Sequence, residues 1–311
     1  MATLVAGDSS PKTTPRVTVI VAAYNCSHTL KCALTSVLGQ TYADFEVWVV
    51  GDCCTDDSEQ VVAGFGDPRL YWFNLPERVG SQSGPNNEGL RRARGEFIAY
   101  LGQDDLWFSW HLESLLATMR ETRAECVNGL IAVLRPDRAP EGYGAPGARF
   151  NGGCSIPPSG WLHRREIIEK CGLWPLPGRL TSGVDFIFQR RAFLAGCRFA
   201  ATGQFSVLKF PSPAWKTYAR SQDNPQPSYL ARLQKDSSSL HRELLTEIAV
   251  EAVRHRENPD VRELFVSFLR TLYWRAVDGY GRERWPVSAF LVWRDRRWRR
   301  RAILLRGLSR Q

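Results

Sequence analysis

The chain has 311 residues, of which 43% are hydrophobic and 23% charged, a composition typical of soluble globular proteins rather than disordered ones. Its eight cysteines form no Cys-x-x-Cys pair and lie near no histidine cluster, so neither a zinc site nor a disulfide framework is indicated, and we expect reduced thiols in the cytoplasm. The start of the chain has no charged-then-apolar leader, and no run of about 18 apolar residues occurs, so we expect neither export nor a membrane span.

The first 135 residues alternate between predicted strands and predicted helices. Residues 1–15 are expected to be a flexible leader. The Val- and Ile-rich run 16–25 predicts a buried central strand, and residues 27–41 predict a helix that Ser27 or Asn25 caps and Gly39 ends. The further predicted elements are a strand over 45–50, a helix after a cap at Asp56 or Asp57, a strand over 69–74, a helix over 85–95 and a strand over 96–102. This alternation predicts a doubly wound, mostly parallel α/β sheet with flanking helices.

The second half of the chain has a less regular pattern. We predict a helix over 111–121, a strand over 127–135, helices over 162–172 and 181–196, a strand or hairpin over 198–210, and helices from about Ser237 onward. The Pro- and Gly-rich stretch 136–160 is the best candidate for a domain boundary or a mobile lid. The predicted division is therefore a leader (1–15), a nucleotide-binding α/β half (16–135), an acceptor-side half (136–235) and a helical C-terminal extension (236–311).

Three polar loops follow three of the predicted strands: Ala22 to Asn25, Gly51 to Asp57, and Gln103 to Asp105. In open α/β sheets ligands bind beyond the carboxyl ends of the strands, so we expect these loops to form one cleft. The first loop contains no glycine, which argues against a dinucleotide fingerprint, and a P-loop is also absent. Tyr24 could stack on a base and Asp52 could accept from a ring N–H, which favours a single nucleotide joined through a diphosphate to another group.

Asp104 and Asp105 are adjacent like charges that repel each other unless a cation lies beside them. Two carboxylates at a strand end can share one Mg²⁺ or Mn²⁺, whose open positions substrate phosphates then fill. The alternative is that they cap the helix that follows near Trp107. The convergence of three loops favours the metal interpretation.

The order of these motifs, VTVIVAAYN, FEVWVVGDCCTDDS and LRRARGEFIAYLGQDDLW, resembles the nucleotide-binding half of the family 2 glycosyltransferases, which have the GT-A fold and usually act with inversion. A weaker resemblance covers about residues 160–200. The resemblance implies that Ala22, Tyr24, Asp52 and Asp104 bind the nucleotide and that Asp105 is the direct ligand of Mn²⁺ or Mg²⁺. It also implies that Asp185 is the catalytic base and that Arg191 is a supporting basic residue on the same helix.

The chain departs from the family pattern at several of these positions. The family commonly has two acids, a glycine and a serine where this chain has residues 51–54 (Gly-Asp-Cys-Cys), so the base need not be uracil. Gln103 occupies the first place of the metal motif, and Val184 replaces an acid often found before the catalytic aspartate. Asp185 could instead cap the helix after Thr181-Ser-Gly.

The expected function is therefore transfer of a sugar from a nucleoside-diphosphate sugar, with UDP the first choice, to a glycan or lipid-linked acceptor in cell-surface polysaccharide or glycolipid synthesis. The alternatives are a sugar nucleotidylyltransferase, or a nucleotide- or nucleic-acid-binding protein on this scaffold without transferase activity. A nucleotidylyltransferase would usually show a glycine- and Arg/Lys-rich first loop, which this chain lacks.

The net charge of +9 is concentrated in residues 282–311, where ten arginines against Glu283 and Asp295 give +8 and leave about +1 for the rest. Tryptophans and aliphatic residues lie between the arginines. Such a segment can bind an anionic membrane surface as an amphipathic helix, which predicts peripheral association at the inner face of the membrane, or it can solvate one face of a helix docked on the body. No nucleic-acid motif accompanies it, so nucleic acid is not the expected partner.

Overall fold

The computed structural model describes residues 14–144, 150, 155–177, 183–218 and 224–257. Almost all of the predicted leader and all of the basic segment 282–311 lie outside these ranges. In the described part of the chain, none of the helices combines the length and apolar character needed to cross a membrane.

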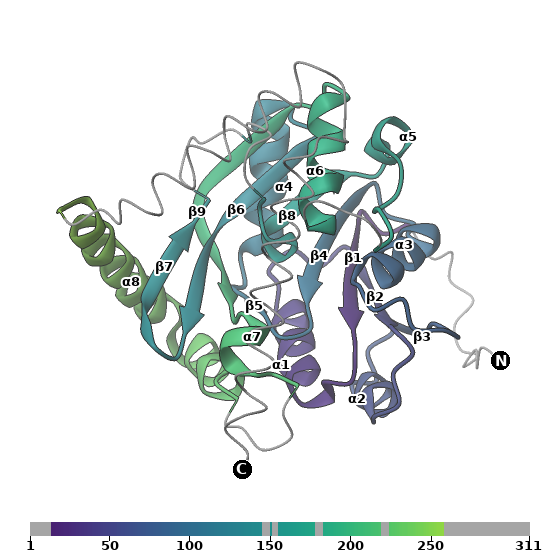
Figure 1. Cartoon of the computed structure of the whole chain (residues 1–311), viewed down its shortest axis with the longest axis horizontal. Helices are drawn as coiled ribbons and strands as arrows, with labels where there is room; N and C mark the ends of the chain where they lie inside the picture. The colour runs from purple at the N-terminus through teal and green to yellow at the C-terminus, as the bar shows by residue number, and fades with distance from the viewer. Residues whose placement is uncertain (1–13, 145–149, 151–154, 178–182, 219–223, 258–311) are drawn as a thin grey trace, which may run out of the picture.

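The described strands form one sheet with the order β3-β2-β1-β4-β8-β6-β9-β5, and β7 pairs with β6 outside this path (Figure 1). The first four strands of this order are mutually parallel, as the alternating sequence predicts, and β1 lies inside the sheet between β2 and β4. These strands are β1 (Val17–Ala23), β2 (Phe45–Gly51), β3 (Leu70–Asn74) and β4 (Phe97–Gly102).

The other half of the sheet is mixed. β8 is antiparallel to β4 and β6, β9 is parallel to β6, and β5 and β7 are antiparallel to β9 and β6. The strands are β5 (Leu106–Trp107), β6 (Cys126–Arg135), β7 (Arg138–Tyr143), β8 (Trp161–Arg164) and β9 (Phe199–Lys209). The doubly wound, mostly parallel sheet is confirmed, with antiparallel strands confined to this half.

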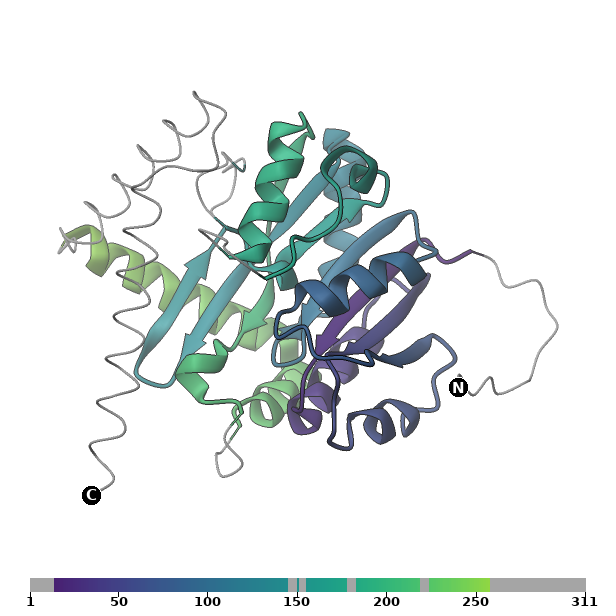
Figure 2. The same ribbon diagram turned by 45° about the vertical axis from the view of Figure 1, so that its right-hand side comes forward.

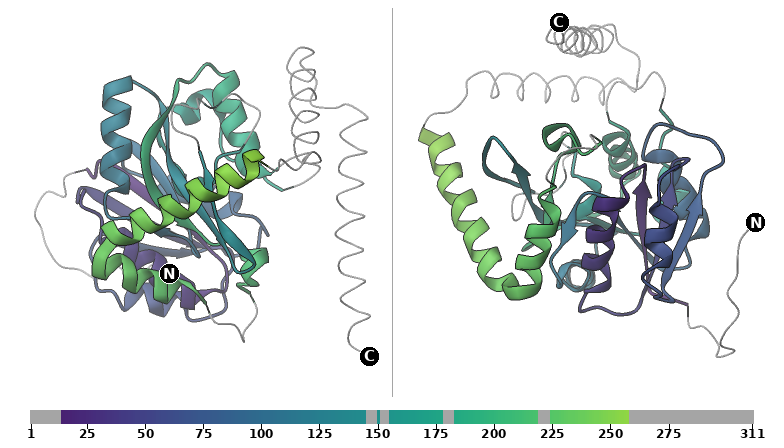
Figure 3. Two further views of the ribbon diagram at one scale, coloured as in Figure 1. Left: turned by 90° about the vertical axis from the view of Figure 1, so that its left-hand side faces the viewer. Right: turned by 90° about the horizontal axis from the view of Figure 1, so that it is seen from below.

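Helices cover both faces of the sheet (Figures 1 and 3). Because side chains alternate along a strand, Val19 packs with Leu30 of α1 and Leu112 of α4, whereas Ile20 packs with α3, α5 and α6 on the opposite face. The bounds are α1 (Ser27–Leu38), α2 (Ser58–Ala63), α3 (Ser83–Arg92), α4 (His111–Thr122), η1 (Pro158–Gly160), α5 (Ile167–Cys171), α6 (Val184–Leu194) and α7 (Ser212–Trp215).

The long helix α8 (Gln226–Glu257) packs against β7 and α1 through buried Leu240 and Leu244, and crosses behind β7 in Figure 2. It is two helices joined at Asp236, whose φ of −158° is not helical. The Asp236 carboxylate accepts a 2.9 Å hydrogen bond from the N–H of Ser239, so it caps the second half. The predicted helix start near Ser237 is that of the second half, and the prediction missed the first.

Three further local predictions differ from the structure. The predicted helix over 162–172 is strand β8 followed by the short α5, and part of the predicted lid, residues 138–143, is strand β7. α1 has no side-chain cap from Ser27 or Asn25. Instead, Asp56 of the next loop accepts from the Ser27 N–H (3.0 Å), and the same carboxylate accepts from the Ser58 N–H (3.2 Å) at the start of α2.

The predicted boundary between residues 135 and 136 lies in the turn between β6 and β7, and that between 235 and 236 lies at the kink of α8. Strands β8 and β9 of the second half pair into the same sheet as β1–β4.

Candidate active site

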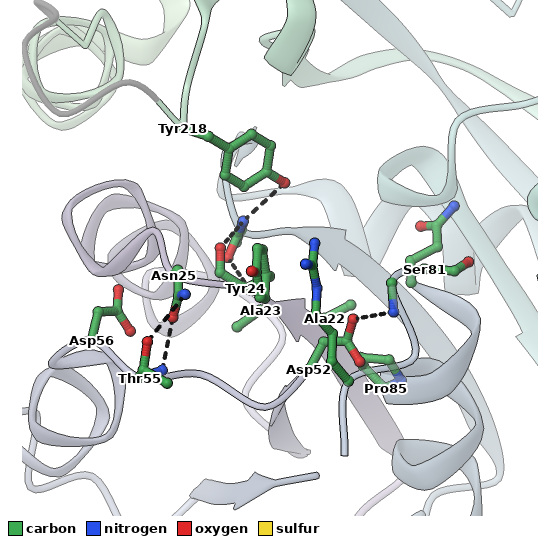
Figure 4. Close-up of a pocket in the computed structure, with 14 residues that line it drawn as sticks. Ala22, Ala23, Tyr24, Asn25, Asp52, Thr55, Asp56, Ser81, Pro85 and Tyr218 are labelled. Carbon is green, nitrogen blue, oxygen red and sulfur yellow. Dashed lines mark hydrogen bonds between the residues drawn. The ribbon is translucent and has the colours of Figure 1, made fainter. Parts of the chain in front are cut away.

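The carboxyl ends of β1, β2 and β4 lie level with one another at one edge of the sheet, because Ala23 pairs with Gly51 and Ala22 with Gly102. Beyond them is a pocket of about 720 Å³, a size usual for small-molecule sites. The three loops predicted to converge all contribute to it. Its lining is Ala22, Ala23, Tyr24, Asn25, Asp52, Thr55, Asp56, Arg78, Gly80, Ser81, Gln82, Pro85, Gln103 and Tyr218 (Figure 4).

Side-chain hydrogen bonds join the first two of these loops. The Thr55 N–H donates to Asn25 Oδ1 (2.8 Å), and Asn25 Nδ2 donates to Thr55 Oγ1 (3.3 Å). Asp56 extends this link through its bond to the Ser27 N–H. Burial alone would raise the pKa of Asp56, but its hydrogen bonds from Ser58 and Ser27 lower it, so the carboxylate is ionised at neutral pH.

Tyr24 is at the centre of the pocket. Its backbone N–H donates to Gln103 Oε1 (2.7 Å), and Gln103 Nε2 returns a bond to the Tyr24 carbonyl (3.2 Å). The Arg78 guanidinium lies over the Tyr24 ring, 4.2 Å from its centroid. The ring of Tyr218 faces Tyr24 across the pocket, with the two ring centroids 6.2 Å apart (Figure 4). Gln103 therefore positions the aromatic ring predicted to stack on a base.

Asp52 is only 4% exposed and accepts two 2.7 Å hydrogen bonds, from the backbone N–H groups of Val79 and Gly80. It thereby holds the loop that carries Arg78 against the pocket. Its predicted role as an acceptor from the base stays a prediction, and a base would share oxygens that already accept from the chain.

Asp104 and Asp105 are buried and are not among the residues that line the pocket. Asp105 is fully buried. Its Oδ1 accepts from the Phe210 N–H (3.0 Å), and its Oδ2 accepts from Ser159 Oγ and from Lys209 Nζ (3.0 Å). Asp104 accepts from Ser212 Oγ. Neither carboxylate caps α4, which has no side-chain cap, so the alternative interpretation of the pair is wrong.

The cation beside the acidic pair in this structure is therefore Lys209. Burial alone would lower the pKa of Lys209, but the charges of Asp105 and Asp104 outweigh that effect and raise it. Burial, and then the charge of Asp105, raise the pKa of Asp104 to about 6.

A divalent cation on Asp105 needs a free oxygen lone pair directed at an open position. Both oxygens of Asp105 already accept from protein donors, and no group of three or more His, Cys, Asp or Glu side chains in the described residues is arranged to hold a metal. The Asp105 carboxylate, whose Oδ2 is already 3.0 Å from the Lys209 ammonium, therefore does not fit such a cation without displacement of Lys209. The predicted Mn²⁺ or Mg²⁺ at Asp105 stays a prediction.

Asp185 is in the first turn of α6, half-buried, and accepts from Ser155 Oγ (2.7 Å). After the charges of Asp105 and Asp104, its charge is a further cause that raises the pKa of Lys209. No side-chain cap bond is made at the start of α6, which is contrary to the capping alternative for Asp185. Arg191 is on the same helix and donates to the Leu173 carbonyl (3.5 Å), away from the pocket lining.

Several residues of this site were not singled out from the sequence. Arg78 lies between the predicted strand over 69–74 and the predicted helix over 85–95. The others are contributed by segments beyond residue 150 that contact the acidic pair or the pocket: Ser159, Lys209, Ser212 and Tyr218. The one available signal was a lysine at the end of an apolar strand, which the structure places beside Asp105.

The comparisons with known proteins match this geometry. The family model for glycosyl transferase family 2 matches residues 18–151, which include all three pocket loops. Residues 18–151 belong to glycosyl transferase family 2.

One curated relative of this family 2 segment is UDP-Glc:alpha-D-GlcNAc-diphosphoundecaprenol beta-1,3-glucosyltransferase WfgD of Escherichia coli, 34% identical over 113 residues, 36% of this chain and 44% of the relative. Another is the succinoglycan biosynthesis protein ExoO of Rhizobium meliloti, 42% identical over 91 residues, 29% of this chain and 26% of the relative. The matches thus span less than half the length of either relative.

Solved structures show the fold. S. aureus TarS in complex with UDP-GlcNAc superposes with a TM-score of 0.55 at 19% identity, over 78% of this chain and 73% of that one. Mannosyltransferase PcManGT of Pyrobaculum calidifontis, in complex with GDP-Man and Mn²⁺, gives a TM-score of 0.51 at 16% identity over 91% of this chain and 86% of that one. The family 2 segment and the strands that complete its sheet thus form a GT-A fold.

Proposed function

We propose that this protein is a glycosyltransferase that moves a sugar from a nucleoside-diphosphate sugar to an acceptor hydroxyl. One observation carries the proposal: the loops after β1, β2 and β4, all within the family 2 segment, line a single pocket beyond the carboxyl ends of parallel strands. A nucleoside fits this lining, with Tyr24 and Tyr218 as stacking surfaces, Asp52 and Gln103 as polar contacts, and Ala22 allowing close approach to the floor. The donors bound by the structural neighbours are UDP-GlcNAc and GDP-Man, so UDP and GDP are the nucleotides to test.

We propose Asp185 as the general base. The Asp185 carboxylate would take the proton of the acceptor hydroxyl while the acceptor oxygen forms a bond to the anomeric carbon. The bond between that carbon and the phosphate oxygen breaks, and its electron pair stays on the departing nucleoside diphosphate. A single displacement with one base and no covalent intermediate inverts the anomeric centre.

Nucleotide binding can be tested by titrating UDP and GDP separately into the full chain in a calorimeter. Replacing Tyr24→Ala removes a stacking surface and should weaken binding about tenfold to hundredfold, since one base stacked on an aromatic ring is worth roughly 1–3 kcal/mol. Arg91→Met, on the exposed side of α3, is the control and should bind like the wild type. Equal binding by Tyr24→Ala and the wild type would contradict the placement of the nucleoside.

A variant of Asp185 should distinguish a role in catalysis from a role in nucleotide binding. Once a donor and an acceptor are found, Asp185→Asn should retain nucleotide affinity but slow transfer by roughly 10²- to 10⁴-fold, the usual contribution of a general base. Asp137→Asn, with a carboxylate that is 64% exposed in the β6–β7 turn, is the matched control. Undiminished transfer by Asp185→Asn would remove it from the catalytic role.

The acceptor is proposed to be a glycan or a lipid-linked saccharide, because curated relatives act on a diphosphoundecaprenol-linked sugar or in succinoglycan biosynthesis. Residues 282–311, outside the described ranges, are proposed to bring the enzyme to an anionic membrane surface through their ten arginines. The protein is expected to sediment with phosphatidylglycerol vesicles but not with phosphatidylcholine vesicles. Sedimentation with neither kind of vesicle, or equally with both, would contradict this role of the segment.

A further inference from the structure

Lys209 is the last residue of β9, and this strand end brings it to the acidic pair. Its Nζ lies 3.0 Å from Asp105 Oδ2, while the next residue, Phe210, donates its N–H to Asp105 Oδ1 (3.0 Å). The parallel pairing of β9 with β6, which places Lys209 opposite Val133, sets this position. Lys209 is therefore held beside Asp105 by backbone contacts of the sheet as well as by its charge.

Unlike Asp105, the Lys209 side chain is partly exposed. Asp105 is completely buried, whereas 27% of the Lys209 side chain is exposed. An ammonium group has three N–H donors, and in the described part of the chain Asp105 is its only hydrogen-bond acceptor. Two donors are thus left for a ligand.

Lys209 is linked through Asp105 to both functional parts of the site. Gln103, two residues before Asp105, lines the nucleoside pocket. Ser155 donates to Asp185 (2.7 Å), and Ser159, in the same short segment, donates to the Asp105 oxygen that holds Lys209. In a nucleotide-sugar donor the diphosphate connects the nucleoside to the sugar carbon that the acceptor attacks. A donor with its nucleoside in the pocket and its sugar carbon near Asp185 would place its diphosphate beside Lys209.

We propose that the Lys209 ammonium, in place of a divalent cation on Asp105, supplies the positive charge that binds the donor diphosphate. This inference rests on the proposed glycosyltransferase function. As the bond from the sugar to the phosphate oxygen breaks, the electron pair adds negative charge to the diphosphate next to Lys209, and the hydroxyl proton goes to Asp185. Asp105 is a positioning residue, because it fixes the ammonium group through a buried charge-assisted hydrogen bond.

Three carboxylates near this single ammonium make its charge important. Without Lys209, a diphosphate would approach Asp104, Asp105 and Asp185 with no neighbouring cation from this strand. Negative charges brought together in a partly buried site repel each other more strongly than they do in water. Removal of Lys209 would also free an oxygen of Asp105, so it should create the metal preference that the wild type lacks.

The test is calorimetric titration of UDP and GDP into the full chain, first with EDTA and then with Mn²⁺. The wild type should bind equally well in both. Lys209→Met should lose at least tenfold in affinity in EDTA and recover with Mn²⁺, whereas Lys209→Arg should stay within a few-fold of the wild type. Lys31→Met, which removes one exposed charge from α1, is the matched control and should bind normally.

Electron paramagnetic resonance of Mn²⁺ supplies a readout that does not depend on nucleotide binding. Bound Mn²⁺ is expected in Lys209→Met and not in the wild type, with circular dichroism showing that both are folded. Wild-type binding that is lost in EDTA, restored by Mn²⁺ and unchanged by Lys209→Met would overturn the role of Lys209 while leaving the transferase proposal intact. No binding of either nucleotide to any variant with or without Mn²⁺ would overturn the donor proposal and this inference together.

Discussion

Residues 51–54 show how individual positions adapt to the geometry of the site. Cys53 stands where the family commonly has glycine, and its φ of +60° is in the left-handed region that only glycine adopts without cost. Gly51 stands where the family commonly has an acid, and a Cβ there would be 2.5 Å from Asn74 Oδ1 and 2.9 Å from Trp72. The Asn74 amide fills that space, since it bonds to both backbone groups of Cys54 (2.8 and 2.9 Å).

Substitutions at Cys53 and Gly51 should change the stability of the protein in opposite directions. Cys53→Gly should raise the free energy of unfolding by roughly 0.5–1 kcal/mol, because the strain removed exceeds the chain entropy added. Gly51→Ala should lower it by about 2 kcal/mol, as expected for overpacking against fixed neighbours. Urea unfolding measures both. Cys53→Ala keeps the positive φ and should show no gain, so an equal gain in Cys53→Ala would refute the strain argument.

At the scale of elements, caps come from contacts that the sequence only partly indicates. Asp236 caps the second half of α8 through its bond to the Ser239 N–H, whereas Asp57 precedes α2 and makes no such bond. Both are acids placed just before a helix, and only the structure distinguishes them. A single carboxylate, Asp56, serves the starts of both α1 and α2.

This difference predicts unequal costs for two similar substitutions. Asp236→Ala should destabilise the protein by about 1 kcal/mol through the lost cap, while Asp57→Ala should change stability by only a few tenths of a kcal/mol. Chemical denaturation of the two variants at neutral pH measures the difference. Equal effects would mean that the Asp236 cap contributes nothing beyond its charge.

For the whole molecule, two buried histidines connect stability to pH. The Nδ1–H of His163 donates to the Arg164 carbonyl (2.7 Å), so its Nε2 accepts from the Tyr100 hydroxyl (2.9 Å), and a neutral ring satisfies both. Burial lowers the pKa of His163 to about 4 and that of His111 to about 3. Unfolding would let both rings protonate at about pH 6.5.

Because these folded-state pKa values are depressed, the two histidines bind more protons in the unfolded chain, and their contribution to stability falls as pH drops from about 6.5 toward 4. Between pH 7 and pH 5 each histidine should remove about 2 kcal/mol from the free energy of unfolding. His163→Gln should be less stable at pH 7 but should lose about half of this pH-dependent decrease. An unchanged pH dependence in that variant would show that His163 does not carry it.

The sequence by itself determined the alternation of strands and helices through Asp105, the direction of the parallel strands and the three loops of the cleft. These follow from local periodicity and from the rule that parallel strands present their carboxyl ends at one edge. Tyr24, Asp52 and Gln103 could therefore be assigned to one pocket before their contacts were known.

Only the tertiary structure decided which residues contact the acidic pair, Asp104 and Asp105. Lys209 is 104 residues from Asp105 along the chain, and the pairing of β9 with β6 and β5 brings the two together. Ser159 is 54 residues from Asp105 and Ser212 is 108 residues from Asp104, so these contacts too come from remote segments. The antiparallel strands β7 and β8 replace a predicted loop and part of a predicted helix. Contacts of this kind depend on strand pairings between distant segments, which no local pattern of residues records, and they decide whether a carboxylate is open to a metal or already paired with a lysine.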